Sequence, residues 1–204
     1  MFTDPFTKCT PQEIDVLLKI LDQQKPNHGF HVPGLMALKK SLDFYEGAFF
    51  YELTQADHHP AKNIALVANK QSVLLCDGMA QTIESYNKNA PIKLDQTKVM
   101  DYVRFYFAHV VGPHGITTIV DTVDDLLLVE EPTPGLRKAL SDKITPMALN
   151  AALSDGTYQL RATLLVAKTL YGVLIDVDSQ GKIDVQRTRV LAEILPVVNR
   201  ALES

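Results

Sequence analysis

The sequence has little cysteine and no long apolar run. Cys9 and Cys76 are its only cysteines, too few for a disulfide framework or for a zinc site built on paired thiolates, and one disulfide between them stays open. No stretch approaches the roughly eighteen apolar residues of a membrane span, and residues 1–15 lack the cationic start and apolar region of a signal peptide. We therefore expect a cytoplasmic protein without membrane contact.

Clusters of basic residues are also missing. The net charge is −4, and the neutralisation of phosphates requires gathered Lys and Arg side chains. Nucleic acid is therefore disfavoured as a partner. The 204 residues are 46% hydrophobic and 22% charged, which is typical of an ordinary globular protein. We predict a single domain over 1–204, and any seam should fall near 129–135, in the acidic, proline-marked loop EEPTPG.

The common catalytic and nucleotide-binding motifs do not occur. The sequence contains no GxxxxGK[ST], GxGxxG, HExxH, GxSxG or CxxC. The phosphate-cradling, zinc-protease, hydrolase and thioredoxin chemistries therefore have no support from a motif. We accordingly predict no cofactor.

The densest aromatic stretch lies at the middle of the chain, over 95–111. Asp95 is a suitable N-cap and Gly112-Pro113 ends the element, which predicts a helix of about four to five turns. The alternative is a strand, because residues 103–111 also alternate in polarity and are rich in β-branched and aromatic side chains. The helical spacing is carried by Val99, Tyr102, Val103, Tyr106 and Val110.

The remaining segments predict the fold class. Thr10 to Glu13 form a capping box with proline at the first helical position, so a helix follows. Strands are expected at 48–55, 63–69, 72–76, 116–123, 158–166, 170–177 and 182–189, and helices at 79–87, within 136–153 and at the C-terminus, whereas 34–45 is either a short helix or irregular. The prediction is an α+β fold. A mostly antiparallel sheet of about six to seven strands in two runs packs around the central helix, with flanking N- and C-terminal helices.

The C-terminal region bears on self-association. The run LIDVDSQGKI resembles the hairpin pattern of profilin-like or roadblock-type regulatory domains, over this hairpin alone, and no function is carried over from it. The polar-faced strand 182–189 indicates a sheet edge. The apolar residues after it exceed what one buried face needs, so we expect a homodimer. These residues are Val190, Leu191, Ile194, Leu195, Val197, Val198 and Leu202.

Arg104 and His109 are the polar residues of the apolar central segment, and His114 follows in a Gly-Pro-His-Gly turn. A guanidinium in apolar surroundings needs a carboxylate, a carbonyl or a ligand. Arg104, His109 and His114 are therefore the candidate ligand-binding residues, for a small anion or carboxylate. The competing interpretation pairs Arg104 with an internal acid such as Asp101.

Three other groups carry weaker signals. Asp57-His58-His59 lacks the spacing at which histidines share a metal, Cys76 follows an apolar strand with no base beside it, and the acidic residues between 121 and 131 lack a calcium-loop pattern. We interpret these as a solvated loop, a buried thiol and a solvated face. We predict no metal site and no assigned catalytic residue.

Two functions follow. The favoured one is a non-enzymatic interaction or regulatory domain of the bacterial adaptor type, with a protein partner. The alternative is a small-molecule-binding protein or enzyme with a pocket around Arg104, His109 and His114.

Overall fold

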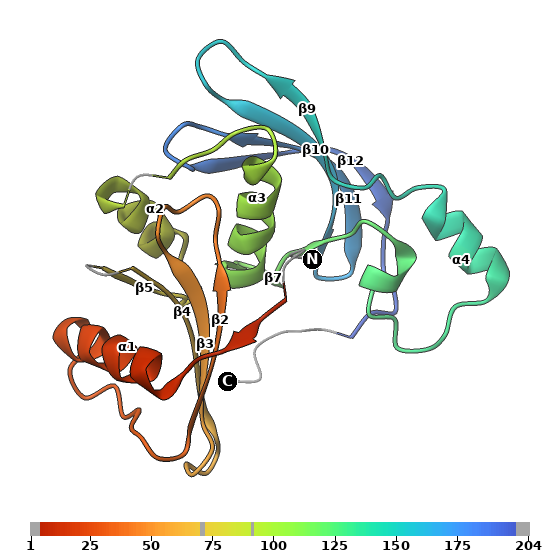
Figure 1. Cartoon of the computed structure of the whole chain (residues 1–204). Helices are drawn as coiled ribbons and strands as arrows, with labels where there is room; N and C mark the ends of the chain where they lie inside the picture. The colour runs from red at the N-terminus through yellow and green to blue at the C-terminus, as the bar shows by residue number, and fades with distance from the viewer. Residues whose placement is uncertain (1–4, 70–71, 91, 199–204) are drawn as a thin grey trace. The chain divides into compact units, whose positions relative to one another are not determined.

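The computed structural model describes residues 5–69, 72–90 and 92–198. By its internal contacts the chain divides into two compact units. Unit 1 takes in residues 1–77 and 81–93, and unit 2 takes in residues 78–80 and 94–204. Residues 129–135 lie inside unit 2, and the single domain over 1–204 stays a prediction. Each unit is described by itself below, with the element labels of Figure 1.

Unit 1 is built on a five-stranded antiparallel sheet in the order β1-β2-β3-β4-β5. Its strands are β1 (Thr7–Lys8), β2 (Leu35–Ser41), β3 (Phe49–Gln55), β4 (Lys62–Ala68) and β5 (Val73–Leu75), and its helices are α1 (Pro11–Gln24) and α2 (Ala80–Asn89). The meander expected over 48–76 and the helix expected at 79–87 are confirmed. The segment 34–45 is neither a helix nor irregular throughout, since it contains β2.

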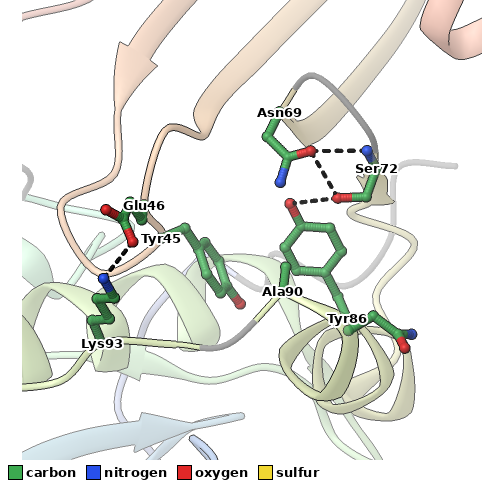
Figure 2. Close-up of a pocket in the computed structure, with 8 residues that line it drawn as sticks. Tyr45, Glu46, Asn69, Ser72, Tyr86, Ala90 and Lys93 are labelled. Atoms are coloured by element: carbon green, nitrogen blue, oxygen red, sulfur yellow. Dashed lines mark hydrogen bonds and ion pairs between the residues drawn. The ribbon is translucent and has the colours of Figure 1, made fainter.

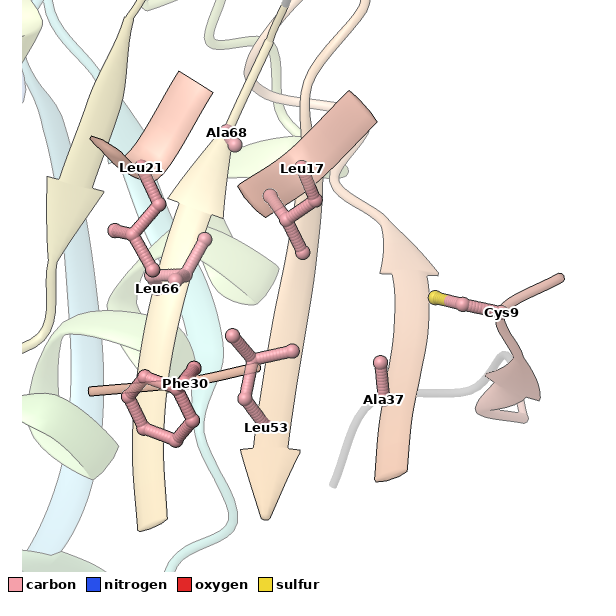
Figure 3. Packing of buried hydrophobic residues seen from close by; sticks show 8 residues of the cluster. All are labelled: Cys9, Leu17, Leu21, Phe30, Ala37, Leu53, Leu66 and Ala68. Carbon is pink, nitrogen blue, oxygen red and sulfur yellow. The ribbon is translucent and has the colours of Figure 1, made fainter. Parts of the chain in front are cut away.

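Helix α1 begins where the sequence indicates and covers one face of this sheet. Thr10 Oγ1 accepts from the Glu13 amide at 3.3 Å, and the Glu13 carboxylate accepts from the Thr10 amide at 2.9 Å, so the predicted capping box is confirmed. Leu17 and Leu21 point from α1 toward Leu53 and Leu66 on the strands (Figure 3). This apolar layer fixes the position of α1 on the sheet.

Unit 2 contains a second antiparallel sheet, in which β12-β11-β10-β8 are neighbours and β9 pairs with β10. A separate short hairpin joins β6 (Val111–Gly112) to β7 (Gly115–Ile116). The other strands are β8 (Thr118–Ile119), β9 (Ala148–Ala152), β10 (Tyr158–Val166), β11 (Thr169–Val177) and β12 (Ile183–Ala192), and the helices are α3 (Lys98–His109), the 3₁₀ turn η1 (Val123–Asp125) and α4 (Pro134–Ser141).

The central segment is a helix, as predicted, although α3 is shorter than expected. The Asp95 carboxylate accepts from the amides of Thr97 and Lys98 at 2.9 and 2.8 Å, and therefore caps the first turn. The helix is buried along most of its length. Tyr102 is fully buried and its hydroxyl donates to the Gly181 carbonyl at 2.5 Å, which ties α3 to the turn between β11 and β12.

The helices expected in unit 2 are confirmed only in part. Of the one or two short helices expected within 136–153, α4 is present, whereas 148–152 form strand β9, whose residues pair with β10. Alanine favours helices, but intrinsic propensity is a weak signal, and cross-strand pairing overrides it here. The C-terminal helix, expected at least after Pro196, is contradicted at Val197 and Val198, because Val197 forms a β-bridge with Leu128 and the Val198 amide donates to the Leu127 carbonyl. Residues 199–204, including Leu202, lie outside the described residues.

The extended segment after β12 pairs with residues 127–129. Leu128 and Val197 form an antiparallel bridge, and the Val198 amide donates to the Leu127 carbonyl at 2.8 Å. Leu195 and Val197 belong to a buried apolar cluster with Val120, Leu126 and Leu140. Much of the apolar C-terminal sequence therefore packs within unit 2.

The coarse fold prediction is confirmed, because the structure mixes helices with mostly antiparallel strands. The finer arrangement differs. The described residues contain four α-helices and twelve strand segments in several sheets, rather than about six to seven strands. No helix among the described residues is both long enough and apolar enough to cross a membrane.

Candidate functional site

A cavity of about 490 Å³ lies in unit 1, and we call it the tyrosine cavity. This volume falls within the range of small-molecule sites in proteins, about 300–1,000 Å³. Figure 2 shows its lining side chains converging from separate segments, with Glu46 and Lys93 on one side and Asn69, Ser72 and Tyr86 on the other. The full lining is Tyr45, Glu46, Asn69, Ser72, Tyr86, Asn89, Ala90 and Lys93.

Two tyrosine rings form the aromatic part of the wall. Tyr45 and Tyr86 are both buried, and their rings meet edge to face with centroids 5.2 Å apart. The Tyr45 hydroxyl donates to Oδ1 of the buried Asn87. Burial raises the pKa of Tyr86 above its ordinary value, so this phenol stays neutral near pH 7. The rings thus give the cavity a rigid, uncharged surface.

Asn69 and Ser72 form a polar corner beside Tyr86. Asn69 Oδ1 accepts from the Ser72 amide at 2.8 Å and from the Ser72 hydroxyl at 3.0 Å. The Ser72 hydroxyl also lies 3.4 Å from the Tyr86 hydroxyl. The hydrogen-bond partners of the Ser72 hydroxyl are thus an amide oxygen and a phenol, and neither group is a base.

Glu46 and Lys93 form an ion pair at the rim of the cavity (Figure 2). Their side chains are 74% and 59% exposed, so both charges remain hydrated. The Lys93 amide donates to the Phe44 carbonyl at 2.9 Å and Tyr45 bridges to Ile92, so the backbone holds the two side chains opposite each other. The hydrogen bond from Lys93 lowers the pKa of Glu46 below its ordinary value. The rim therefore carries one fixed charge of each sign.

The groups around the cavity favour binding over proton transfer. A general acid or base works best with a pKa near the working pH. Here the pKa of Tyr86 is raised and that of Glu46 is lowered, both away from neutrality. Elsewhere in unit 1, Cys76 has its pKa raised to about 12, chiefly by burial, which keeps its thiol protonated and unreactive.

The structure brings Arg104 to an acid of unit 2. Arg104 Nη2 lies 2.7 Å from Asp121 Oδ2, with both side chains about a quarter exposed or less. The other oxygen of Asp121 accepts from the Met147 amide at 2.8 Å. The internal partner of Arg104 is therefore Asp121 and not Asp101, which is closer along the sequence. Asp121 already neutralises the guanidinium.

His109 and His114 do not join Arg104 on one surface. At about 100° per residue, Arg104 and His109 lie roughly 140° apart around α3. His109 is half-buried, its ring centroid lies 4.9 Å from that of Phe105, and burial lowers its pKa to about 4. His114 is exposed in the turn between β6 and β7. An anion site at these residues stays a prediction.

The other candidates from the sequence are two cysteines, the Asp57-His58-His59 group and the acidic segment. Cys9 and Cys76 are free thiols. Asp57, His58 and His59 are exposed in the connection between β3 and β4, where Asp57 lies 3.2 Å from His31. Several carboxylates of the acidic segment serve ion pairs and caps, such as Asp124 with Arg137 at 2.6 Å. Among the described residues, no group of three or more His, Cys, Asp or Glu side chains could hold a metal.

Sequence reasoning missed the tyrosine cavity. Its lining comes from the β2–β3 connection, the segment between β4 and β5, α2 and the segment after α2. These segments form no motif along the chain. The usable signal was the set of tyrosines and asparagines between 45 and 89, since tyrosine combines an apolar ring with a polar hydroxyl and asparagine supplies an amide.

Comparisons with protein-family models, with curated proteins and with solved structures found no match for this chain.

Proposed function

We propose that the chain is a non-enzymatic, cytoplasmic binding protein, and that its tyrosine cavity takes a small molecule carrying one cationic and one anionic group. The observation that supports this most is the Glu46–Lys93 pair at the rim of a cavity walled by Tyr45 and Tyr86. A ligand ammonium is matched by the Glu46 carboxylate and the tyrosine rings, and a ligand phosphate or carboxylate is matched by Lys93.

The exposed ion pair can give way to such a ligand at little cost. Surface pairs contribute about 0–1 kcal/mol to stability, so separating Glu46 from Lys93 requires little free energy. The ligand then replaces one ion pair with two. Asn69 and Asn89 add amide groups that can hydrogen-bond either end.

Binding of zwitterions is the test of this proposal. We expect phosphocholine or glycine betaine to bind the wild-type protein in titration calorimetry, and choline or phosphate alone to bind at least about ten-fold more weakly, because each loses one charged contact. Lys93→Met and Glu46→Gln should each weaken zwitterion binding by a similar factor.

The matched control is Lys98→Met, which removes another partly exposed lysine that pairs with Asp95 at 3.4 Å. This variant should bind like the wild type. A zwitterion panel without any binding, or equal binding by Lys93→Met, would refute the proposal.

A second candidate function is self-association through unit 2. In the ladder of residues 127–129 and 196–198, the side chains of Leu127, Val129 and Val198 are 40%, 64% and 55% exposed. Nearby Ile194 is 86% exposed at a φ of 54°, which is rare for a β-branched residue. An exposed apolar surface of this kind is typical of an interface. We call these four residues the ladder surface.

If the ladder surface joins two copies, sedimentation should show a dimer at tens of micromolar protein. Val129→Lys should give a monomer, because an unpaired charge in an apolar interface costs several kcal/mol. The control Lys138→Ala, at an exposed position of α4, should leave the dimer intact. A wild-type protein that sediments as a monomer would remove this candidate.

A further inference from the structure

An apolar groove of about 320 Å³ lies in unit 1 between α1 and the sheet, and we call it the α1 groove. Val16, Leu17 and Ile20 of α1 form one wall, and the rings of Phe49 and Tyr51 on β3 form the other. Val16 is 57% exposed and Phe49 is 37% exposed. An apolar ligand that covers these walls removes their surface from water, which favours binding.

The volume of the α1 groove sets the size of a ligand. An apolar cavity of about 150 Å³ holds one benzene molecule. A groove of about 320 Å³ therefore has room for one aromatic ring that carries a short alkyl chain or a second ring. The Phe49 and Tyr51 rings, with centroids 6.3 Å apart and planes tilted by 58°, give such a ring an aromatic surface to pack against.

The charges near the α1 groove are already matched within the protein. Glu13 is the charged residue of its lining, and its carboxylate pairs with Lys39. The Lys39 ammonium also lies 5.3 Å from the centroid of the Phe49 ring. A charged ligand would compete with this ion pair and lose hydration against apolar walls. The α1 groove therefore favours an uncharged ligand.

The Tyr51 hydroxyl is the polar group that such a ligand can bind. Among the described residues it has no hydrogen-bond partner. Burial, followed by the charges of Cys9 and Glu13, raises the pKa of Tyr51 to about 12, so the phenol is neutral at pH 7. The influence of Glu13 places this hydroxyl at the Glu13 end of the groove. A neutral phenol both donates and accepts a hydrogen bond.

We infer that the α1 groove binds a small, uncharged phenol with a short alkyl chain or a second ring. Its apolar body lies between Val16, Ile20 and Phe49, and its hydroxyl forms a hydrogen bond with that of Tyr51. The α1 groove and the tyrosine cavity are separate pockets that share the lining residue Asn69. This second site does not depend on the function proposed for the cavity.

Four probe ligands test the chemistry of the site. In titration calorimetry at pH 7 we expect 4-propylphenol and 2-naphthol to bind the wild-type protein. Propylbenzene should bind about two- to ten-fold more weakly than 4-propylphenol, because it lacks the hydrogen bond. The anion 4-propylbenzoate should bind at least about ten-fold more weakly. The inference is overturned if neither phenol binds, or if 4-propylbenzoate binds as tightly as 4-propylphenol.

Tyr51→Phe tests the position of the ligand hydroxyl. This variant should bind 4-propylphenol only as tightly as propylbenzene, and its affinity for propylbenzene should not change. Tyr158→Phe is the matched control, because it removes the hydroxyl of another half-buried strand tyrosine, in unit 2, and it should bind both ligands like the wild type. An unchanged preference for 4-propylphenol in Tyr51→Phe would contradict the inferred hydrogen bond.

Val16→Glu tests the position of the apolar body. It places a charge on the groove wall and should weaken 4-propylphenol binding at least about ten-fold, while phosphocholine binding stays as in the wild type. Gln23→Glu adds the same charge at an exposed position of α1 outside the groove, and it should bind 4-propylphenol normally. Normal 4-propylphenol binding by Val16→Glu would overturn the inference.

A second copy of the chain is the other occupant that these variants detect. If the wild-type protein sediments as a dimer, Val16→Glu as a monomer, and neither phenol binds, the α1 groove is an interface between copies. That result would also overturn the inference.

Discussion

Replacement of Phe105 by alanine is expected to lower the free energy of unfolding by about 3–5 kcal/mol, the usual cost of removing a buried aromatic side chain. Phe105 is fully buried on α3, and its ring contacts that of His109. Truncation leaves a cavity that the surrounding helix and sheet can fill only in part. Urea denaturation followed by circular dichroism measures the loss.

Ala108→Ser provides the control for Phe105, because Ala108 is exposed on the same helix. It should change stability by no more than about 0.5 kcal/mol. A loss below about 1 kcal/mol in the Phe105 variant would show that α3 contributes little to the core of unit 2.

Acidification is expected to destabilise the protein through His109. Burial lowers the pKa of this imidazole from 6.5 to about 4 in the folded chain. Between these values the unfolded chain binds a proton that the folded chain does not, so stability is complete above about pH 6.5 and falls until about pH 4. At roughly 1.4 kcal/mol per pKa unit, the loss approaches about 3 kcal/mol.

His109→Gln should remove most of this pH dependence, since a neutral amide does not titrate. His114→Gln is the matched control, because His114 is exposed in a turn, and it should keep the dependence of the wild type. Stability curves from pH 7 to pH 4.5 measure the difference between the variants. Parallel curves for the wild type and His109→Gln would contradict the depressed pKa of His109.

Local sequence signals predicted the elements whose causes are local. The capping box at Thr10 and Glu13 and the Asp95 cap depend on side chains within three residues of the amides they bond. Strand β10 alternates in polarity from Tyr158 to Leu164, and β3 and β4 contain runs of apolar, β-branched and aromatic residues. Such elements can be read from the sequence because the hydrogen bonds and the burial pattern follow the order of the residues.

The errors came from contacts between distant residues. Residues 148–152 form a strand because β10 supplies their hydrogen-bond partners, and the segment after β12 is extended because residues 127–129 pair with it. Asp121, the acid that pairs with Arg104, lies outside α3. The tyrosine cavity has the same origin, since Tyr45, Ser72 and Lys93 meet only when the sheet and α2 have formed.

A nuclear magnetic resonance titration with phosphocholine shows whether the tyrosine cavity holds a zwitterion. We predict that the signals of Tyr45, Asn69, Ser72, Tyr86 and Lys93 shift together with one dissociation constant, whereas those of Arg104 and His114 stay in place. Saturating phosphocholine without shifts at the cavity residues, or with shifts centred on Arg104 and His114, would contradict the claim.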